Sequence, residues 1–156
     1  MAGKILEELQ QTKPFLHIEE EAFLNVQRTA DVLMQQLVSV LKVHGLSATQ
    51  YNVLRILRGA GTSGMTCKDV GGRMITPDPD ITRLLDRLEK RNLLTRNRAR
   101  GDRRFVTIQI TQEGLDTLSQ LDAPIRKMQL EMFKHLDEEQ VRQMVDLLET
   151  VRDVSR

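Results

Sequence analysis

Arginines gather at high density near the middle of this 156-residue chain. Five of them occupy nine consecutive positions with one acidic residue among them: Arg96, Arg98, Arg100, Asp102, Arg103 and Arg104. Alternate residues of a β-strand share one face, so the first three arginines should form a row. Guanidinium groups bind phosphate and read guanine edges. We therefore predict that this segment contacts double-stranded DNA, and the alternative interpretation is a solubilising ribbon.

A second group of polar residues precedes the arginine row on a predicted helix that ends near Arg91. Its apolar positions recur at helical spacing and should face the core: Ile81, Leu84, Leu85 and Leu88. The residues left facing outward are Thr82, Arg83 and Arg87, which we predict to contact bases and phosphates. The alternative is a solvated helix face on which Asp86 pairs with Lys90.

The helix before this one also carries cations. Thr66 can cap a short helix that runs through Met74, where Lys68 and Arg73 are candidate phosphate contacts. Their alternative interpretation is plain surface charge.

The pattern of the remaining chain shows which elements must position these residues. A long amphipathic helix is predicted from Ile18 to His44, ended by Gly45, and another follows from Ala48 to Leu57. Residues 59–64 should form a loop. Two strands are predicted over residues 93–99 and 105–110, with Gly101 and Asp102 at the turn.

Long helices are predicted again after the strands. Thr111 should cap a helix that Pro124 kinks or restarts, with Asp122 as a candidate new cap. Asp137 and Gln140 form a capping box before the last helix. The predicted fold is mainly α with a small antiparallel β-wing. It is a winged helix-turn-helix flanked by long N- and C-terminal helices.

Charge is distributed unevenly along the chain. Residues 46–110 hold thirteen basic and six acidic side chains, net +7, whereas residues 1–45 carry −2 and residues 111–156 carry −4. A positive centre between acidic ends is typical of a nucleic-acid-binding module within a larger scaffold.

Enzymatic, metal-binding and membrane functions find little support in the sequence. It has no Gly-rich phosphate loop, nucleophile elbow or His-Glu metal motif, and its three histidines stand apart: His17, His44 and His135. We therefore expect no catalytic residue, no metal and no bound cofactor. No run approaches the length of a transmembrane helix, and one Cys excludes an internal disulfide framework, so we expect a cytoplasmic protein.

Four segments in the right order resemble the MarR family of bacterial transcriptional regulators. They are Leu46–Leu54 (LSATQYNVL), Ile81–Glu89 (ITRLLDRLE), Asp102–Arg104 (DRR) and Ile110–Gly114 (ITQEG). The chain departs from the family pattern at Asn92, where Gly is usual, and at Ile110, where Leu is usual. Asn tolerates the left-handed conformation that a helix exit requires.

The resemblance implies a DNA-binding regulator that acts as a homodimer on a pseudo-palindromic operator, usually as a repressor. It assigns the Thr82–Arg83 pair to the DNA contact, places Arg104 in the minor groove, and gives Asp102 the role of orienting the wing arginine. The expected domains are dimerisation helices over 1–45, the DNA-binding winged helix over 46–110, and dimerisation helices over 111–156. The alternative architecture is a monomer whose long helices fold back over the winged helix.

A small-molecule effector is also implied by the resemblance, since family members often bind aromatic or phenolic anions. The candidate lining is Phe15, His17, Phe23, Arg55 and Met128. Their alternative interpretation is core packing, because Phe and Met at helical spacing usually fill helix contacts.

Two alternative functions are redox sensing and protein–protein interaction. Cys67 begins the helix before the reading helix, and a helix N-terminus can lower a thiol pKa, which would suit a redox-sensing regulator. The alternative there is a small residue buried at a first turn. A winged helix can also serve as a protein–protein interaction module, although such a module has little need for five wing arginines.

Overall fold

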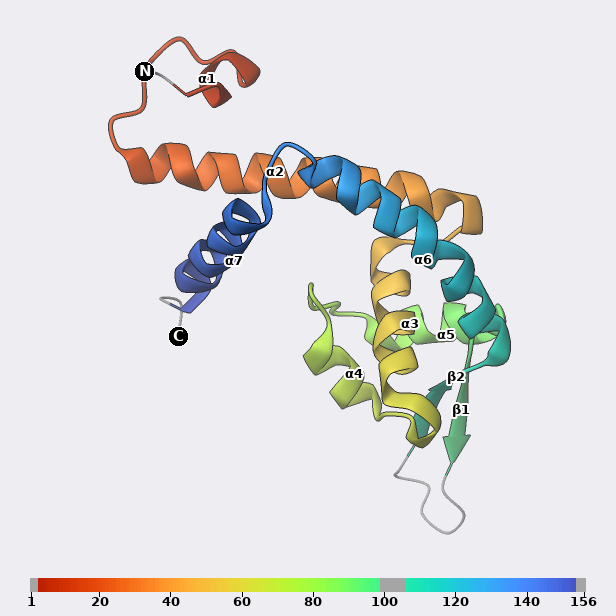
Figure 1. Ribbon diagram of the computed structural model, residues 1–156. Helices are drawn as coiled ribbons and strands as arrows, with labels where there is room; N and C mark the ends of the chain where they lie inside the picture. The colour runs from red at the N-terminus through yellow and green to blue at the C-terminus, as the bar shows by residue number, and fades with distance from the viewer. Residues whose placement is uncertain (1–2, 99–105, 154–156) are drawn as a thin grey trace. The chain divides into compact units, whose positions relative to one another are not determined.

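A computed structural model describes residues 3–98 and 106–153. The chain divides into two compact units, residues 1–48 and residues 49–156. The described residues are mostly helical, with one two-stranded antiparallel sheet (Figure 1). This confirms the predicted fold class. None of the helices in the described ranges is long and apolar enough to cross a lipid bilayer.

The first unit is built around one long helix. The short α1 (Ile5–Glu8) precedes α2 (Ile18–Leu41), and one 3-10 turn, η1 (Lys42–His44), completes the predicted length. Gly45 ends it with φ of 60°, as predicted. The Arg28 guanidinium lies 3.7 Å from the Glu8 carboxylate and links α2 to α1.

Much of the apolar surface of this unit is exposed in the single chain. At least 36% of each of these side chains is accessible to solvent: Leu9, Leu16, Ile18, Phe23, Val26, Val32, Met34, Val38 and Val43. Isolated apolar side chains on a protein surface are ordinary, but a run of them along one element indicates an interaction surface.

The second unit holds the predicted winged helix. Its helices are α3 (Ala48–Ala60), α4 (Cys67–Arg73) and α5 (Ile81–Lys90), followed by β1 (Leu94–Arg98) and β2 (Val106–Ile110). Helix α3 begins one residue inside the first unit. It extends past the predicted end to Ala60, and a 3-10 turn, η2 (Gly61–Ser63), occupies half of the predicted loop.

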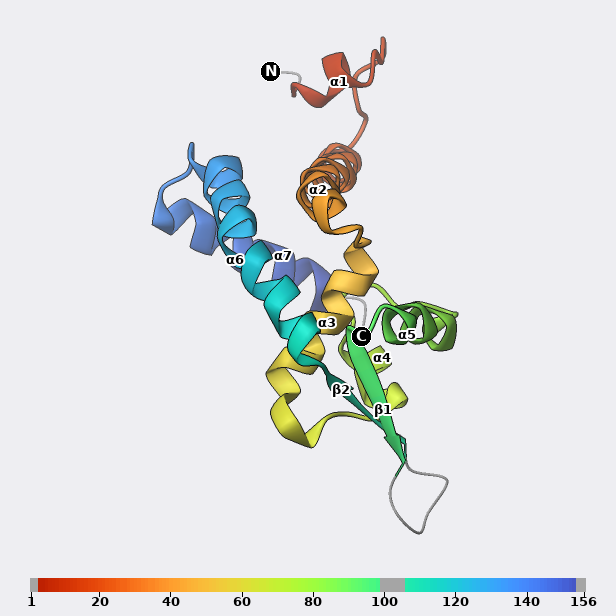
Figure 2. The same cartoon turned by 90° about the vertical axis from the view of Figure 1, so that its right-hand side faces the viewer.

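The two strands form a hairpin with Leu94 opposite Ile110 and Arg98 opposite Val106 (Figure 2). Met65 adds a single bridge beside β2. Its N–H donates to the Ile108 carbonyl over 2.9 Å, and the Ile108 N–H donates back over 2.7 Å. Helix α5 contacts β1, and α4 contacts both α5 and β2, while η2 also contacts β2, so the two strands connect α4, α5 and the turn after α3.

The core of this unit is aliphatic, as the scarcity of aromatic residues predicts. Fully buried side chains come from α3, α4, α5, both strands and α6 (Gln112–Phe133): Val53, Leu54, Leu57, Val70, Leu85, Leu88, Leu94, Ile108, Leu118 and Leu121. Burying each large aliphatic side chain is worth about 1.5–3 kcal/mol. This shared core holds the helices and strands together.

Of the two outcomes predicted at Pro124, a kink or a restart with Asp122 as the new cap, the restart was wrong. Helix α6 runs unbroken from Gln112 to Phe133 with Pro124 inside it, and Thr111 caps it by accepting a hydrogen bond from the Gly114 N–H over 3.0 Å. Proline removes one backbone hydrogen bond and typically costs about 3 kcal/mol. The buried Leu121 and Ile125 on either side of Pro124 offset that loss, because their packing needs a continuous helix.

The last helix, α7 (Glu138–Asp153), begins at the predicted capping box. The Asp137 N–H donates to Gln140 Oε1 over 3.0 Å, and the Gln140 N–H donates to Asp137 Oδ1 over 2.8 Å. None of its described residues is buried in the single chain, despite the apolar stripe of Val141, Met144, Val145, Leu148 and Val151.

Among the described glycines, Gly114 on α6 comes nearest to another backbone group, and a stability prediction follows from this. A Cβ atom there would stand 2.3 Å from the Leu93 carbonyl oxygen and 2.7 Å from Ile110 Cγ1. We expect Gly114→Ala to lower the free energy of unfolding by at least about 1–3 kcal/mol, the usual cost of overpacking. Thermal denaturation measures this as a lower Tm.

Gly72→Ala is the matched control. A Cβ at residue 72 meets nothing within 4 Å, and the residue lies inside α4. Because Ala favours helix more than Gly by about 1 kcal/mol, this variant should be as stable as the parent or more so. Equal melting temperatures for the two variants would contradict the close approach at Gly114.

Candidate nucleic-acid interface

Helix α5 presents a polar face because its apolar face is claimed by the core. Leu84, Leu85 and Leu88 are buried, while Ile81 at the first turn is half-buried. On the other side Thr82, Arg83 and Arg87 are all exposed, as predicted from their spacing. The helix therefore offers a hydroxyl and two guanidinium groups to an anionic partner.

The entry to α5 carries two carboxylates in defined positions. Asp78 Oδ1 accepts a hydrogen bond from the Asp80 N–H over 2.8 Å. The Asp80 side chain makes no cap hydrogen bond and instead contacts Arg83, with Asp80 Oδ2 3.2 Å from Arg83 Nε. Arg83 is nevertheless 72% exposed, so its remaining donors are open to a ligand.

An amide side chain on α3 holds the turn between α4 and α5. The Ile75 N–H donates to Asn52 Oδ1 over 2.9 Å. The loop that leads into α5 is thus tied to the preceding helix through a residue 23 positions earlier in the chain. No local sequence signal indicates this contact, because it joins a helix interior to a distant loop.

Helix α4 places both of its predicted cations at the surface. Thr66 caps it by accepting a hydrogen bond from the Asp69 N–H over 3.2 Å, as predicted, and Lys68 and Arg73 are both exposed. Cys67 is half-buried at the first helical position.

Arg96 meets anionic partners within the protein. Its Nη1 lies 2.5 Å from Asp86 Oδ1 and 3.0 Å from Glu89 Oε2, both on α5. The alternative interpretation of the sequence paired Asp86 with Lys90 on the helix surface, but Asp86 contacts Arg96 on the strand. The signal that sequence reasoning missed is the three-residue spacing of Asp86 and Glu89, which puts both carboxylates on one helix face.

The structure describes both strands of the wing but not residues 99–105 between them. Arg98, at the end of β1, is exposed. The remaining candidate contacts lie outside the described residues: Arg100, Asp102, Arg103 and Arg104. Their assignment to DNA stays a prediction.

The exit of α5 is joined to the start of α6. Asn92 has φ of 58°, the left-handed conformation anticipated for this position. Its carbonyl accepts a hydrogen bond from Thr111 Oγ1 over 2.6 Å, and its side-chain amide donates to Glu113 Oε2 over 2.9 Å. The Leu93 carbonyl accepts from the Thr111 N–H over 3.2 Å. A glycine at residue 92 could not make the bond to Glu113.

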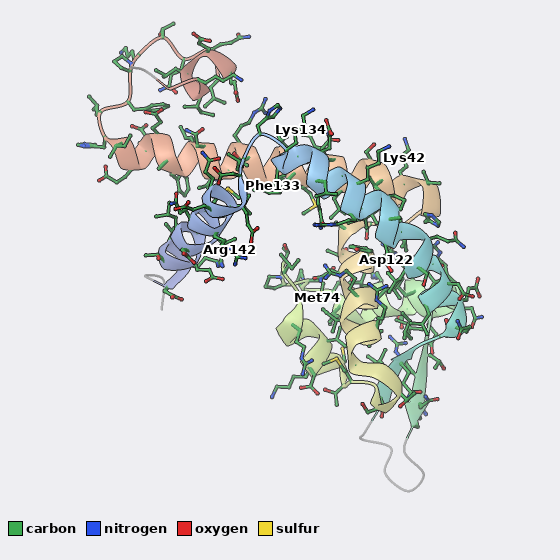
Figure 3. The ribbon with its side chains drawn as sticks, viewed as in Figure 1. Lys42, Met74, Asp122, Phe133, Lys134 and Arg142 are labelled. Atoms are coloured by element: carbon green, nitrogen blue, oxygen red, sulfur yellow. The ribbon has the colours of Figure 1, made fainter. Side chains whose placement is uncertain are left out.

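An ion pair joins α3 to α6. The Arg58 guanidinium donates three hydrogen bonds of 2.9–3.1 Å to the carboxylate of Asp122, which Figure 3 labels on α6. One turn earlier on α3, Arg55 lies over the Tyr51 ring, 5.8 Å from its centroid. Burial raises the pKa of the Tyr51 hydroxyl above its ordinary value, and the nearby positive charge of Arg55 opposes that rise.

The predicted effector residues are divided between the two units. Phe15, His17 and Phe23 belong to the first unit, where Phe23 is 63% exposed, and Arg55 and Met128 belong to the second. Met128 is half-buried on α6, and Arg55 is exposed. The effector site therefore remains a prediction from family resemblance.

Comparison with known proteins gives a consistent picture. The MarR family model matches residues 44–104. The HTH-type transcriptional regulator MhqR of Bacillus subtilis (strain 168) is 31% identical over 108 residues, which cover 69% of this chain and 73% of that protein. A MarR transcription factor from Planctomyces limnophilus is 34% identical with a TM-score of 0.68, and the match covers 87% of this chain and 98% of that one.

A more distant solved structure shares the fold. The MepR–DNA complex of S. aureus has a TM-score of 0.75 at 21% identity, covering 83% of this chain and 94% of that chain. At this identity the likeness shows the fold alone.

The junction at Asn92 generates a second stability prediction. Because Ala disfavours the left-handed conformation, we expect Asn92→Ala to lower the free energy of unfolding by about 1 kcal/mol. Asn92→Gly keeps access to positive φ and loses only the exposed hydrogen bond to Glu113. We therefore expect it to lower the free energy of unfolding by about 0.5 kcal/mol or less. Urea denaturation measures both values. An Asn92→Ala variant as stable as Asn92→Gly would show that backbone conformation does not limit this position.

Proposed function

Since the chain belongs to the MarR family of DNA-binding transcriptional regulators, we propose that it binds a pseudo-palindromic operator as a homodimer and represses transcription there. Each protomer would place α5 in the major groove and its wing in the adjacent minor groove. Two such helices on a two-fold axis read half-sites about one helical turn of DNA, roughly 34 Å, apart.

The observation that carries the docking is the exposed polar face of α5. Thr82, Arg83 and Arg87 lie opposite the buried leucines on one rigid helix, and exposed cations on α4 and β1 are available to hold the flanking phosphates. Phosphate contacts fix the register of a protein on DNA, whereas base contacts supply the sequence information. Arg83 and Arg87 are the candidate base readers, and the assigned phosphate contacts are Lys68, Arg73 and Arg98.

The unburied apolar faces support the homodimer. Helix α7 buries none of its described residues in the single chain, and Leu147 and Val151 are 68% and 65% exposed. A helix of 16 residues with such a stripe is marginal in water unless the stripe packs against something. The apolar row on α2 has the same need. A second copy of this chain supplies matching surfaces for both under two-fold symmetry.

An effector would act by shifting the balance between dimer geometries that fit and do not fit the operator. Of the assigned residues, Arg55 offers an exposed cation beside the buried Tyr51 ring, a pair of groups suited to an aromatic anion. Phe15, His17, Phe23 and Met128 are assigned to effector binding by the family resemblance alone.

Selection of binding sites from a random duplex library tests the proposal directly. We expect enrichment of a pseudo-palindrome with half-sites about ten base pairs apart. Weak, salt-sensitive binding with no enriched sequence would mean that the basic wing attracts DNA only non-specifically. A protein-interaction role for the winged helix would then become the stronger proposal.

Arg83→Ala should weaken binding to the selected duplex by about tenfold or more, because a bidentate arginine–guanine pair contributes about 1–3 kcal/mol. The melting temperature should not change, since the side chain is largely exposed and its ion pair with Asp80 lies at the surface. Fluorescence anisotropy at two salt concentrations measures the affinity.

Arg126→Ala is the matched control for this variant. It removes the same charge from an exposed site on α6, away from the assigned docking surface. Its affinity should stay within about twofold of the parent, as expected for a long-range screened charge. Equal losses in the two variants would refute the assigned role of Arg83.

Val151→Glu should shift the protein from dimer to monomer at micromolar concentration, because it places a charge in the apolar stripe of α7. Thr150→Glu adds the same charge one position away on the exposed polar side and should leave the dimer intact. Sedimentation velocity measures the oligomeric state. A dimer that survives Val151→Glu as well as Thr150→Glu would exclude this face of α7 from the interface.

A further inference from the structure

Arg96 makes four hydrogen bonds to α5 from its place on β1. Its backbone N–H donates to Glu89 Oε1 over 3.2 Å, and its guanidinium donates to Asp86 Oδ1, Glu89 Oε2 and the Thr82 carbonyl oxygen over 2.5, 3.0 and 3.3 Å. We call these groups the Arg96 cluster: Arg96, Asp86, Glu89 and the Thr82 carbonyl.

The cluster joins β1 to α5 along two helical turns. Thr82, Asp86 and Glu89 are spaced by four and three residues, so they lie above one another on one side of the helix. A planar guanidinium can reach all three levels because its donors fan out in one plane. A single side chain therefore fixes both the distance and the rotation of the strand relative to the helix.

The position of Arg96 on its strand suits this role. Leu94, Arg96 and Arg98 share one face of β1, and along it the side chains change from buried to half-buried to exposed. Leu94 packs in the core and Arg98 reaches solvent, while Arg96 lies between them against α5. Its side chain is only 24% exposed, compared with 72% for Arg83.

The local charge argues against a phosphate contact by Arg96. One guanidinium stands against two carboxylates within 3.0 Å, which leaves the cluster with a net charge of −1. Phosphate would be repelled by that charge and would have to displace partners that are already well placed. No carboxylate of the described residues forms an ion pair with Arg98, two residues along the strand.

We propose that Arg96 is a positioning residue for DNA reading, which acts through α5 and does not contact DNA. It holds α5 and β1 as one rigid body, so that DNA contacts from the helix and from the strand are made at one fixed spacing. The inference rests on the proposed function, since the spacing matters only when both elements dock on one duplex. Its consequence is that Arg96 governs sequence-specific affinity more than non-specific affinity.

The test compares Arg96 with Arg98, an assigned phosphate contact, and uses Arg126 on α6 as the control. Arg96→Lys keeps the charge but cannot span the cluster, so it should lower affinity for the selected operator by about tenfold while affinity for random duplex changes by less than about twofold. Arg126→Lys makes the same exchange at an exposed position on α6 that carries no assigned DNA contact, and it should bind the operator as the parent does.

The salt dependence separates the two roles further. Arg98→Gln should reduce the slope of log affinity against log salt by about one, as loss of one phosphate contact does. Arg96→Gln should leave that slope unchanged although it weakens operator binding. The proposal would be overturned if Arg96→Lys bound the operator as the parent does. It would also be overturned if Arg96→Gln reduced the slope of log affinity against log salt by about one.

A measurement without DNA keeps the inference distinct from the proposed function. The backbone N–H of residue 96 donates to a side chain of α5, so its protection from hydrogen exchange depends on the cluster. Glu89→Ala and Arg96→Lys should each speed exchange at this amide in the free protein, with the melting temperature within a few degrees of the parent. Arg98→Lys should not.

The two measurements together give distinct outcomes. Unchanged exchange at residue 96 in both variants would overturn the cluster as a mechanical link, whatever the DNA binding shows. Faster exchange in a protein whose wild type selects no DNA sequence would overturn the proposed function, and with it the DNA role of Arg96, while the link between β1 and α5 would stand.

Discussion

Burial of the leucines of α5 is the constraint on which the rest of the winged helix depends. Leu84, Leu85 and Leu88 pack into a core shared by α3, α4, α6 and both strands, and this fixes the rotation of the helix about its axis. Thr82, Arg83 and Arg87 are exposed as a direct result. A helix rotated by a quarter turn would expose leucine and bury arginine, at a cost of several kcal/mol for each buried unpaired charge.

Polar contacts then fix what the leucines leave free. Burial sets the face that α5 presents, but it allows sliding and tilting. The hydrogen bond between Asn52 and Ile75 fixes the loop that enters α5. The Arg96 cluster fixes the middle of the helix against β1, and the left-handed turn at Asn92 fixes the connection after α5. Each of these contacts is modest alone, since an exposed hydrogen bond contributes about 1 kcal/mol. Together they leave the helix one orientation.

The junction at Asn92 and Thr111 also connects the reading helix with α6. The Arg58–Asp122 pair ties α6 to α3 further along, so α6 is fixed to the winged helix at two places. Apolar side chains exposed on α6 and α7, such as Leu130 and Val151, indicate a further partner for the same segment. A structural change in the proposed dimer would therefore reach α5 through short covalent and hydrogen-bonded connections.

The sequence alone determined the elements of this protein, its fold class and the outward face of α5. Helical periodicity, the caps at Thr66, Thr111 and Asp137, and the left-handed Asn92 are local signals, because the atoms involved lie within a few residues of each other. Tertiary structure decided what local signals cannot carry. Arg96 binds Asp86 and Glu89, Asn52 reaches a loop 23 residues away, and α6 continues through Pro124 with the buried Leu121 and Ile125 on either side of it. Such contacts depend on which surfaces the folded chain brings together, and the spacing of residues within one element does not specify this.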